Sequence, residues 1–204
     1  MARIKGGKSK PRKASVIRNT KETQIALSLN IDGTGKAKIK TGLAFLDHML
    51  TLVAGHGLFD LEVKAKGDLD VDYHHTVEDI GICLGKAFKE ALGGKEKIER
   101  YAFLKVPMDE ARAAVTLDIS GRAHLDYKVK IPTGQAGGIP EEIFHEFFDG
   151  FVKNALVTLH IELEKGRNSH HSVEAMFKAF GVALSRASTL NPRKVGVPST
   201  KGTL

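Results

Sequence analysis

The chain has 204 residues, 42% of them hydrophobic, and contains a single cysteine. This length suits one large domain, or two small ones folded together, with enough apolar side chains for a buried core. One cysteine excludes an intrachain disulfide, and no apolar run reaches the length of a membrane span or a signal-peptide core. We therefore expect a soluble cytoplasmic protein with no membrane partner, or a plastid protein if a transit peptide has been removed.

The first residues carry much of the net charge of +7. Residues 1–13 contain six Lys or Arg residues and no acidic residue. Such a segment is typical of a disordered, solvated tail, and it lacks the interleaved aromatic residues that would favour nucleic-acid binding. We predict a basic leader over residues 1–14, a single domain over residues 15–204, and no nucleic-acid partner.

After the leader, the chain contains an internal repeat, with copies at about residues 15–98 and 99–190 and a tail over residues 191–204. Alternating apolar and polar residues over 22–33 recur over 110–121. Both stretches end at a glycine, as half-buried strands often do. A repeat that spans nearly the whole chain predicts two structurally equivalent halves.

Each copy continues with a helical pattern and a second strand pattern. The helical stretches contain His48 and His145, and the strand patterns at residues 61–64 and 161–164 are taken as equivalent. A loop around residues 133–138 lengthens the second copy, and a further helix ends each one. We predict β-β-α-β-α halves in an α+β fold with the sheets outside and the helices packed between them. The pattern does not fix the strand order.

The last helix of each copy begins with the same motif: His74-His75-Thr76-Val77-Glu78 recurs as His170-His171-Ser172-Val173-Glu174. Residues i and i+4 of a helix share a face, so His74 and Glu78 can bind one metal ion together. His75 points about 100° away and is better placed for a second ion. One such motif also occurs at ordinary helix starts, but two copies with identical spacing predict a two-metal site.

Pseudo-twofold symmetry predicts two equivalent ions, each bound by three histidines and one glutamate. The first histidine of each pair would share an ion with the glutamate of its own helix, and the second histidine would complete the other site. Imidazole and carboxylate ligands suit Mn, Fe, Zn or Co, and the lack of thiolates disfavours a structural zinc site. The candidate ligands are His48, His74, His75 and Glu78 in the first half, and His145, His170, His171 and Glu174 in the second.

At these motifs the chain closely resembles the imidazoleglycerol-phosphate dehydratase family, over roughly residues 15–204. The family's fold is similar to the second domain of ribosomal protein S5, present twice. The resemblance implies two manganese ions per active site, and trimers that assemble into a 24-subunit homo-oligomer with active sites between subunits. The segments that carry it are residues 46–50, 74–79, 106–111, 118–122, 170–175 and 198–202.

The resemblance also implies individual roles. One ion would be bound by His48, His75, His170 and Glu174, and the other by His74, Glu78, His145 and His171. Glu22 would act as the acid/base and contact the substrate; the alternative for Glu22 is a surface charge at a helix or strand edge. Its repeat partner Glu110 would be structural. Substrate-binding roles are implied for Arg100, Arg122, Lys178, Ser199, Thr200 and Lys201, several of which would bind phosphate.

The family reaction removes water from D-erythro-imidazole-glycerol phosphate and gives imidazole-acetol phosphate in histidine biosynthesis. The proton to be removed is not next to a carbonyl, so no simple enolate can form. We expect the imidazole ring, as a metal-bound imidazolate, to expel the neighbouring hydroxyl and give a diazafulvene. From the residues alone two alternatives stay open: a two-metal hydrolase that activates a bridging water, and a nucleic-acid-binding module.

Overall fold

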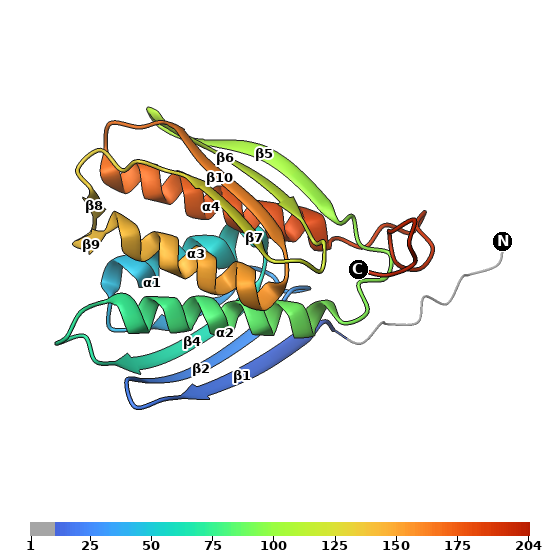
Figure 1. Ribbon diagram of the computed structural model, residues 1–204, viewed down its shortest axis with the longest axis horizontal. Helices are drawn as coiled ribbons and strands as arrows, with labels where there is room; N and C mark the ends of the chain where they lie inside the picture. Colours follow the sequence, from blue (N-terminus) through green and yellow to red (C-terminus); the bar gives the residue numbers. More distant parts are fainter. Residues whose placement is uncertain (1–10) are drawn as a thin grey trace.

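The computed structural model describes residues 11–204, in which four helices lie between two four-stranded sheets (Figure 1). Most of the expected basic leader lies outside the described residues, and the first strand already begins at Lys13. The first half contains β1 (Lys13–Asn19), β2 (Thr23–Asn30), β3 (Ala37–Lys40), α1 (Ala44–Gly57), β4 (Asp60–Gly67) and α2 (His74–Leu92). The second half contains β5 (Tyr101–Met108), β6 (Ala111–Asp118), β7 (His124–Lys128), β8 (Gln135–Ala136), β9 (Ile139–Pro140), α3 (Glu141–Ala155), β10 (Thr158–Lys165) and α4 (Ser169–Ser188).

The two halves share one strand order, which confirms both the duplication and the α+β class. Their sheets run β1-β2-β4-β3 and β5-β6-β10-β7. In each sheet the last two strands are parallel and the other neighbours are antiparallel. The four-stranded sheet of each half has one strand more than the predicted β-β-α-β-α, because β3 and β7, with four and five residues, are too short for a clear sequence pattern. The loop expected around residues 133–138 contains β8, which forms a small hairpin with β9.

The strand pairing corrects the alignment predicted for β4 and β10. Asn30 in β2 lies opposite Asp60 in β4, and its counterpart Asp118 in β6 lies opposite Thr158 in β10. Asp60 is therefore equivalent to Thr158, and the predicted alignment is wrong by two residues. A strand has a side-chain period of two, so a shift of two leaves the same face buried and the sequence pattern looks unchanged.

The core lies between the sheets, where α1 packs against α4 and α2 against α3. Phenylalanines from α3 and α4 fill its centre and pack edge to face, as Phe151 and Phe180 do with ring centroids 4.9 Å apart. Gly81 in α2 lets that helix approach α3 closely, because a Cβ there would collide with the carbonyl oxygen of Phe147. Within residues 11–204, none of the helices has the length and apolar character that a membrane span requires.

Candidate functional site

Both histidine pairs lie in the first turn of a helix, and the two helices start at the same end of the molecule (Figure 1). The backbone N–H of His74 donates to Oδ1 of Asp72 at 2.7 Å. The Asn168 side chain accepts from the backbone N–H groups of His170, at 2.8 Å, and His171, at 3.3 Å. Both contacts satisfy N–H groups that the start of a helix leaves unpaired, although only Asn168 is itself the N-cap residue of its helix.

α1 and α4 bring three of the predicted metal ligands together: His48, His170 and Glu174. Their ligand atoms lie within 4.8 Å of one another. Oε2 of Glu174 lies 3.3 Å from Nε2 of His48 and 3.2 Å from Nε2 of His170. One carboxylate oxygen that faces two ring nitrogens is a donor set that suits a divalent transition metal. These residues therefore fit a metal ion, and we call them the α1–α4 cluster.

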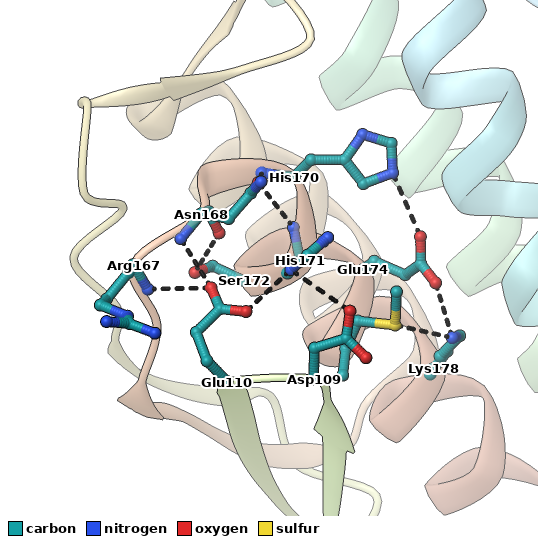
Figure 2. Close-up of polar contacts among 10 residues, drawn as sticks. Asp109, Glu110, Arg167, Asn168, His170, His171, Ser172, Glu174 and Lys178 are labelled. Carbon is teal, nitrogen blue, oxygen red and sulfur yellow. Dashed lines mark hydrogen bonds and ion pairs between the residues drawn. The ribbon is translucent and has the colours of Figure 1, made fainter.

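Glu174 is buried, with 7% of its surface exposed, and it is paired with a cation. Nζ of Lys178 lies 2.6 Å from its Oε1 atom (Figure 2). Burial alone raises the pKa of Glu174, but the hydrogen bonds from Lys178, His48 and His170 together outweigh it and lower the pKa below its usual value. Glu174 is therefore ionised at neutral pH, as a metal ligand must be. The ammonium group of Lys178, which we expect to bind substrate, forms an ion pair with Glu174 in this structure.

The second set of ligands is equivalent by the repeat but less tightly gathered. Nε2 of His74 lies 3.8 Å from Oε2 of Glu78 on α2, as the helix-face reasoning predicts. His145 comes from the neighbouring α3, and its Nδ1 atom faces Oε1 of Glu146 at 3.1 Å. The rings of His145 and Tyr127 also pack in a T-shaped arrangement, with centroids 5.3 Å apart. Among the described residues, only the α1–α4 cluster brings three candidate ligand atoms within 4.8 Å of one another.

The second histidine of each pair faces a carboxylate outside these clusters. Nδ1 of His75 lies 3.0 Å from Oδ2 of Asp68, and Nδ1 of His171 lies 2.8 Å from Oε2 of Glu110 (Figure 2). These hydrogen bonds raise the pKa of both histidines. A carboxylate on Nδ1 fixes the ring and leaves Nε2 for another partner, as in many metal sites. Within one chain, His75 and His171 do not complete the clusters to which they were assigned.

Glu22 and Glu110 occupy equivalent positions but have different surroundings. Glu110 accepts hydrogen bonds from the backbone N–H groups of Arg167, at 3.2 Å, and Asn168, at 2.8 Å, in addition to His171. These contacts lower the pKa of Glu110 to about 2, the His171 bond contributing most. The Glu22 side chain is 53% exposed, and its nearest charged partner is Nε2 of His75 at 3.9 Å. Glu110 thus holds the α4 start in place, whereas the Glu22 carboxylate stays exposed beside His75.

The residues expected to bind phosphate lie at the opposite end of α4 from His170. The backbone N–H of Arg100 donates to the carbonyl of Ala187, near the end of this helix. Its guanidinium binds Asp118, with Nε to Oδ1 at 2.8 Å, and donates to the carbonyl of Pro198 at 2.9 Å. The tail after α4 lies at this end (Figure 1), and its sequence contains Ser199, Thr200 and Lys201. Exposed Arg122 lies here too, beside Gly121, which closely approaches Leu204.

α4 has 20 residues, so its two ends are about 30 Å apart. One chain therefore does not bring its own tail to its own α1–α4 cluster. Sequence reasoning also missed Asp68 and Asn168, which hydrogen-bond to the predicted histidines. The carboxylate partners of the histidines lie elsewhere in the sequence and carry no spacing signal, whereas the helix cap of Asn168 follows a recognisable sequence rule.

Two equivalent halves, with histidine and glutamate side chains gathered at helix starts, define a duplicated α+β protein with a candidate divalent-metal site. The sequence model described as imidazoleglycerol-phosphate dehydratase matches residues 41–184. The protein of that name from Janthinobacterium sp. (strain Marseille) is 54% identical over 96% of this chain and 100% of its own length. The one from Geobacter metallireducens is 55% identical over 95% and 99%.

Solved structures agree with these sequence relatives. The imidazoleglycerol-phosphate dehydratase of Staphylococcus aureus superimposes with a TM-score of 0.79 at 38% identity, covering 88% of this chain and 99% of that one. The Pyrococcus furiosus enzyme, solved in complex with (S)-C348, gives a TM-score of 0.80 at 38% identity, covering 93% and 100%. The chain belongs to the imidazoleglycerol-phosphate dehydratase family. It is accordingly a carbon–oxygen lyase that removes water, a hydro-lyase of histidine biosynthesis.

Proposed function

We propose that the chain removes water from D-erythro-imidazole-glycerol phosphate, in a manganese-dependent reaction that gives imidazole-acetol phosphate. The α1–α4 cluster carries this proposal, because its two imidazoles and one carboxylate meet at the distances that a bound divalent cation needs. The repeat supplies an equivalent set from α2 and α3. Two sets in a chain of this family support two manganese ions per active site.

We assign His48, His75, His170 and Glu174 to one ion, and His74, Glu78, His145 and His171 to the other. When bound, the two cations would favour the deprotonated form of the substrate's imidazole ring, which becomes the electron source for the elimination. Asp68 and Glu110 would hold His75 and His171 with Nε2 directed outward, as their hydrogen bonds to Nδ1 indicate.

The electron-rich ring would expel the neighbouring hydroxyl, which takes up the proton that the ring gave up and leaves as water, and the ring becomes a diazafulvene. The adjacent carbon would then lose its proton, and the ring would regain one. We assign the removal of the carbon-bound proton to Glu22. Its carboxylate is exposed and lies near His75, so it can reach a substrate whose ring is bound beside that histidine. The resulting enol tautomerises to the ketone. Glu110 is unsuited to this task, because its oxygens already accept three hydrogen bonds.

The active site would lie between subunits of a homo-oligomer, with trimers assembling into a 24-subunit particle. Each chain gathers two or three ligands per cluster, while His75 and His171 face away from the cluster they are assigned to. The residues that we assign to the phosphate lie at the far end of α4. These are Arg100, Arg122, Ser199 and Lys201; Thr200 of the same tail and Lys178 beside the α1–α4 cluster would also contact the substrate. A second copy of the chain can supply the missing groups to both ends.

The test is turnover of imidazole-glycerol phosphate by chelator-stripped protein, with and without added Mn²⁺. We expect no turnover without metal and full turnover with it. Folded, manganese-loaded protein that leaves this substrate unchanged would overturn the proposal. Release of phosphate from generic phosphate esters by the same protein would instead support a two-metal hydrolase.

A further inference from the structure

A polar triad lies beneath Glu22 in the first half. Asp79 of α2 is 4% exposed, and it accepts a hydrogen bond from the Thr23 hydroxyl at 2.5 Å. Nε of Arg18 on β1 lies 2.8 Å from the other carboxylate oxygen of Asp79. We call these three side chains the Arg18–Asp79–Thr23 triad. It joins β1, β2 and α2 at the end of the sheet that bears Glu22.

The triad has no polar counterpart in the second half. Strand register makes Arg18, opposite Ile25, equivalent to Val106, opposite Ala113. The same repeat makes Thr23 equivalent to Ala111 and Asp79 equivalent to Ala175. All three counterparts are apolar and belong to or pack against the core. The same strands and helix therefore pack together at this position of the second half without a charged side chain.

Asp79 is buried and the Arg18 side chain is 31% exposed; an ion pair with a buried carboxylate is commonly no more stabilising than apolar residues of similar size, because that charge must be removed from water. The second half demonstrates an apolar solution in the same architecture. A stability role alone therefore does not account for the triad, and the nearest feature that also differs between the halves is Glu22. Its counterpart Glu110 is held directly by His171 and two backbone N–H groups, whereas Glu22 has only the 3.9 Å contact with His75.

The triad reaches Glu22 through the turn between β1 and β2. The Thr20 hydroxyl accepts hydrogen bonds from the backbone N–H groups of Glu22, at 3.1 Å, and Thr23, at 2.9 Å. The Thr20 and Thr23 hydroxyls lie 3.2 Å apart. Asp79 thus anchors Thr23, and the turn built on Thr23 and Thr20 fixes the backbone of Glu22. In the second half Met108 replaces Thr20, so this turn has neither hydroxyl.

We infer that Arg18, Asp79 and Thr23 are positioning residues, which fix the backbone of Glu22 so that its carboxylate meets the substrate in the reactive geometry. The inference rests on the proposed acid/base role of Glu22. A displacement of about 1 Å at a reacting group can cost about a hundredfold in rate, so such an anchor has a measurable effect.

The test replaces the triad by its second-half counterparts in the variant Arg18→Val/Thr23→Ala/Asp79→Ala, assayed as the metal-loaded full chain. We expect an unchanged manganese content, a Tm within a few degrees of the parent, and a kcat lowered about 10–100-fold with a much smaller change in KM. In this background Glu22→Gln should lower kcat far less than in the parent, because both changes remove the same contribution, a correctly placed Glu22 carboxylate. Independent, additive effects, or a parental kcat in the triple variant, would overturn the inference.

A milder pair covers the case in which the triple variant does not fold. Thr23→Val removes the hydroxyl at nearly constant shape, whereas Thr23→Ser keeps it. We expect Thr23→Val to lower kcat about tenfold and Thr23→Ser to rescue most of that loss, and equal kcat values in both would overturn the inference. Glu22→Gln alone distinguishes failure of the proposed Glu22 role from failure of the positioning inference. If it leaves kcat intact, the role of Glu22 and the inference fall together; if it abolishes kcat while Thr23→Val does not lower it, only the inference falls.

Discussion

Oε2 of Glu174 lies 3.3 Å from Nε2 of His48, although 126 residues separate them in the chain. The two side chains come from α4 and α1, which pack side by side between the sheets. His170 on the same face of α4 completes the group. Packing of these two helices therefore builds a candidate ligand set that neither helix contains alone.

We expect His48→Ala to lower the affinity for Mn²⁺ by more than about tenfold, since loss of even an outer-shell partner commonly costs about 10–100-fold. Metal content after dialysis against Mn²⁺ measures this. His160→Ala is the matched control, because His160 pairs with Asp126 on the outer face of β10 and contacts no candidate ligand. Equal metal retention in the two variants would contradict a ligand role for His48.

Glu22 and Glu110 should separate activity from stability. Glu110→Ala removes the acceptor for His171 and for two backbone N–H groups before α4, so we expect Tm to fall by roughly 2–4 °C. Glu22→Ala removes no hydrogen bond and should leave Tm almost unchanged while abolishing turnover. Thermal melts and initial rates on both variants test this. A larger fall in Tm for Glu22→Ala than for Glu110→Ala would contradict it.

Arg12 ties the start of β1 to the end of α4 and makes stability depend on pH. Its guanidinium binds Asp32 at 2.6 Å and donates to the carbonyl of Ser188. The hydrogen bond from Arg12 lowers the pKa of Asp32, so the contribution is present above the unfolded pKa of about 3.9 and is lost as pH falls through the lower folded value.

We therefore expect Asp32→Asn to lower Tm at pH 5 and to make progressively less difference as the pH falls below about 4. Calorimetric melts of both proteins between pH 5 and pH 2.5 measure this. A Tm difference that stays constant with pH would show that the ionised pair does not contribute.

The close approach of α2 and α3 should make Gly81 intolerant of substitution. A Cβ at Gly81 would collide with the carbonyl oxygen of Phe147. Because that oxygen belongs to the backbone of α3, the two helices would have to move apart to relieve the collision. We expect Gly81→Ala to destabilise the fold by about 1–3 kcal/mol and to weaken metal binding, because His74 and His145 lie on these two helices. Gly55→Ala is the control: its Cβ meets nothing within 4 Å and should be neutral or stabilising by up to about 1 kcal/mol. Equal denaturation midpoints in the two variants would contradict the packing argument.

Helical spacing and the repeat predict a large part of this site from sequence. His74 and Glu78 share a helix face by periodicity alone, and the repeat extends the argument to His170 and Glu174. The repeat also identifies His48, whose distance from Glu174 in the chain hides the contact. Helix packing then confirms that His48 lies beside them.

Other features give no such signal. β3 has only four residues, too few for the alternation of its two lysines with Ala37 and Ile39 to indicate a strand, and pairing with β4 establishes its strand character. The alignment of β4 with β10 fails by two residues because a period of two conceals that error. The Arg18–Asp79–Thr23 triad is visible only where the two copies of the repeat differ, and its meaning depends on contacts that span three elements.

Subunit mixing tests whether one active site draws on two chains. His170→Ala disables the α1–α4 cluster, and Lys201→Ala disables the tail about 30 Å away at the other end of α4. If each site combines the cluster of one subunit with the tail of another, dissociating and reassembling equal amounts of the two inactive variants restores activity. Random mixing should give about a quarter of the parental value, because each contributing subunit is intact in half of the sites. Either variant reassembled alone is the control, and a mixture that stays as inactive as these would contradict a shared site.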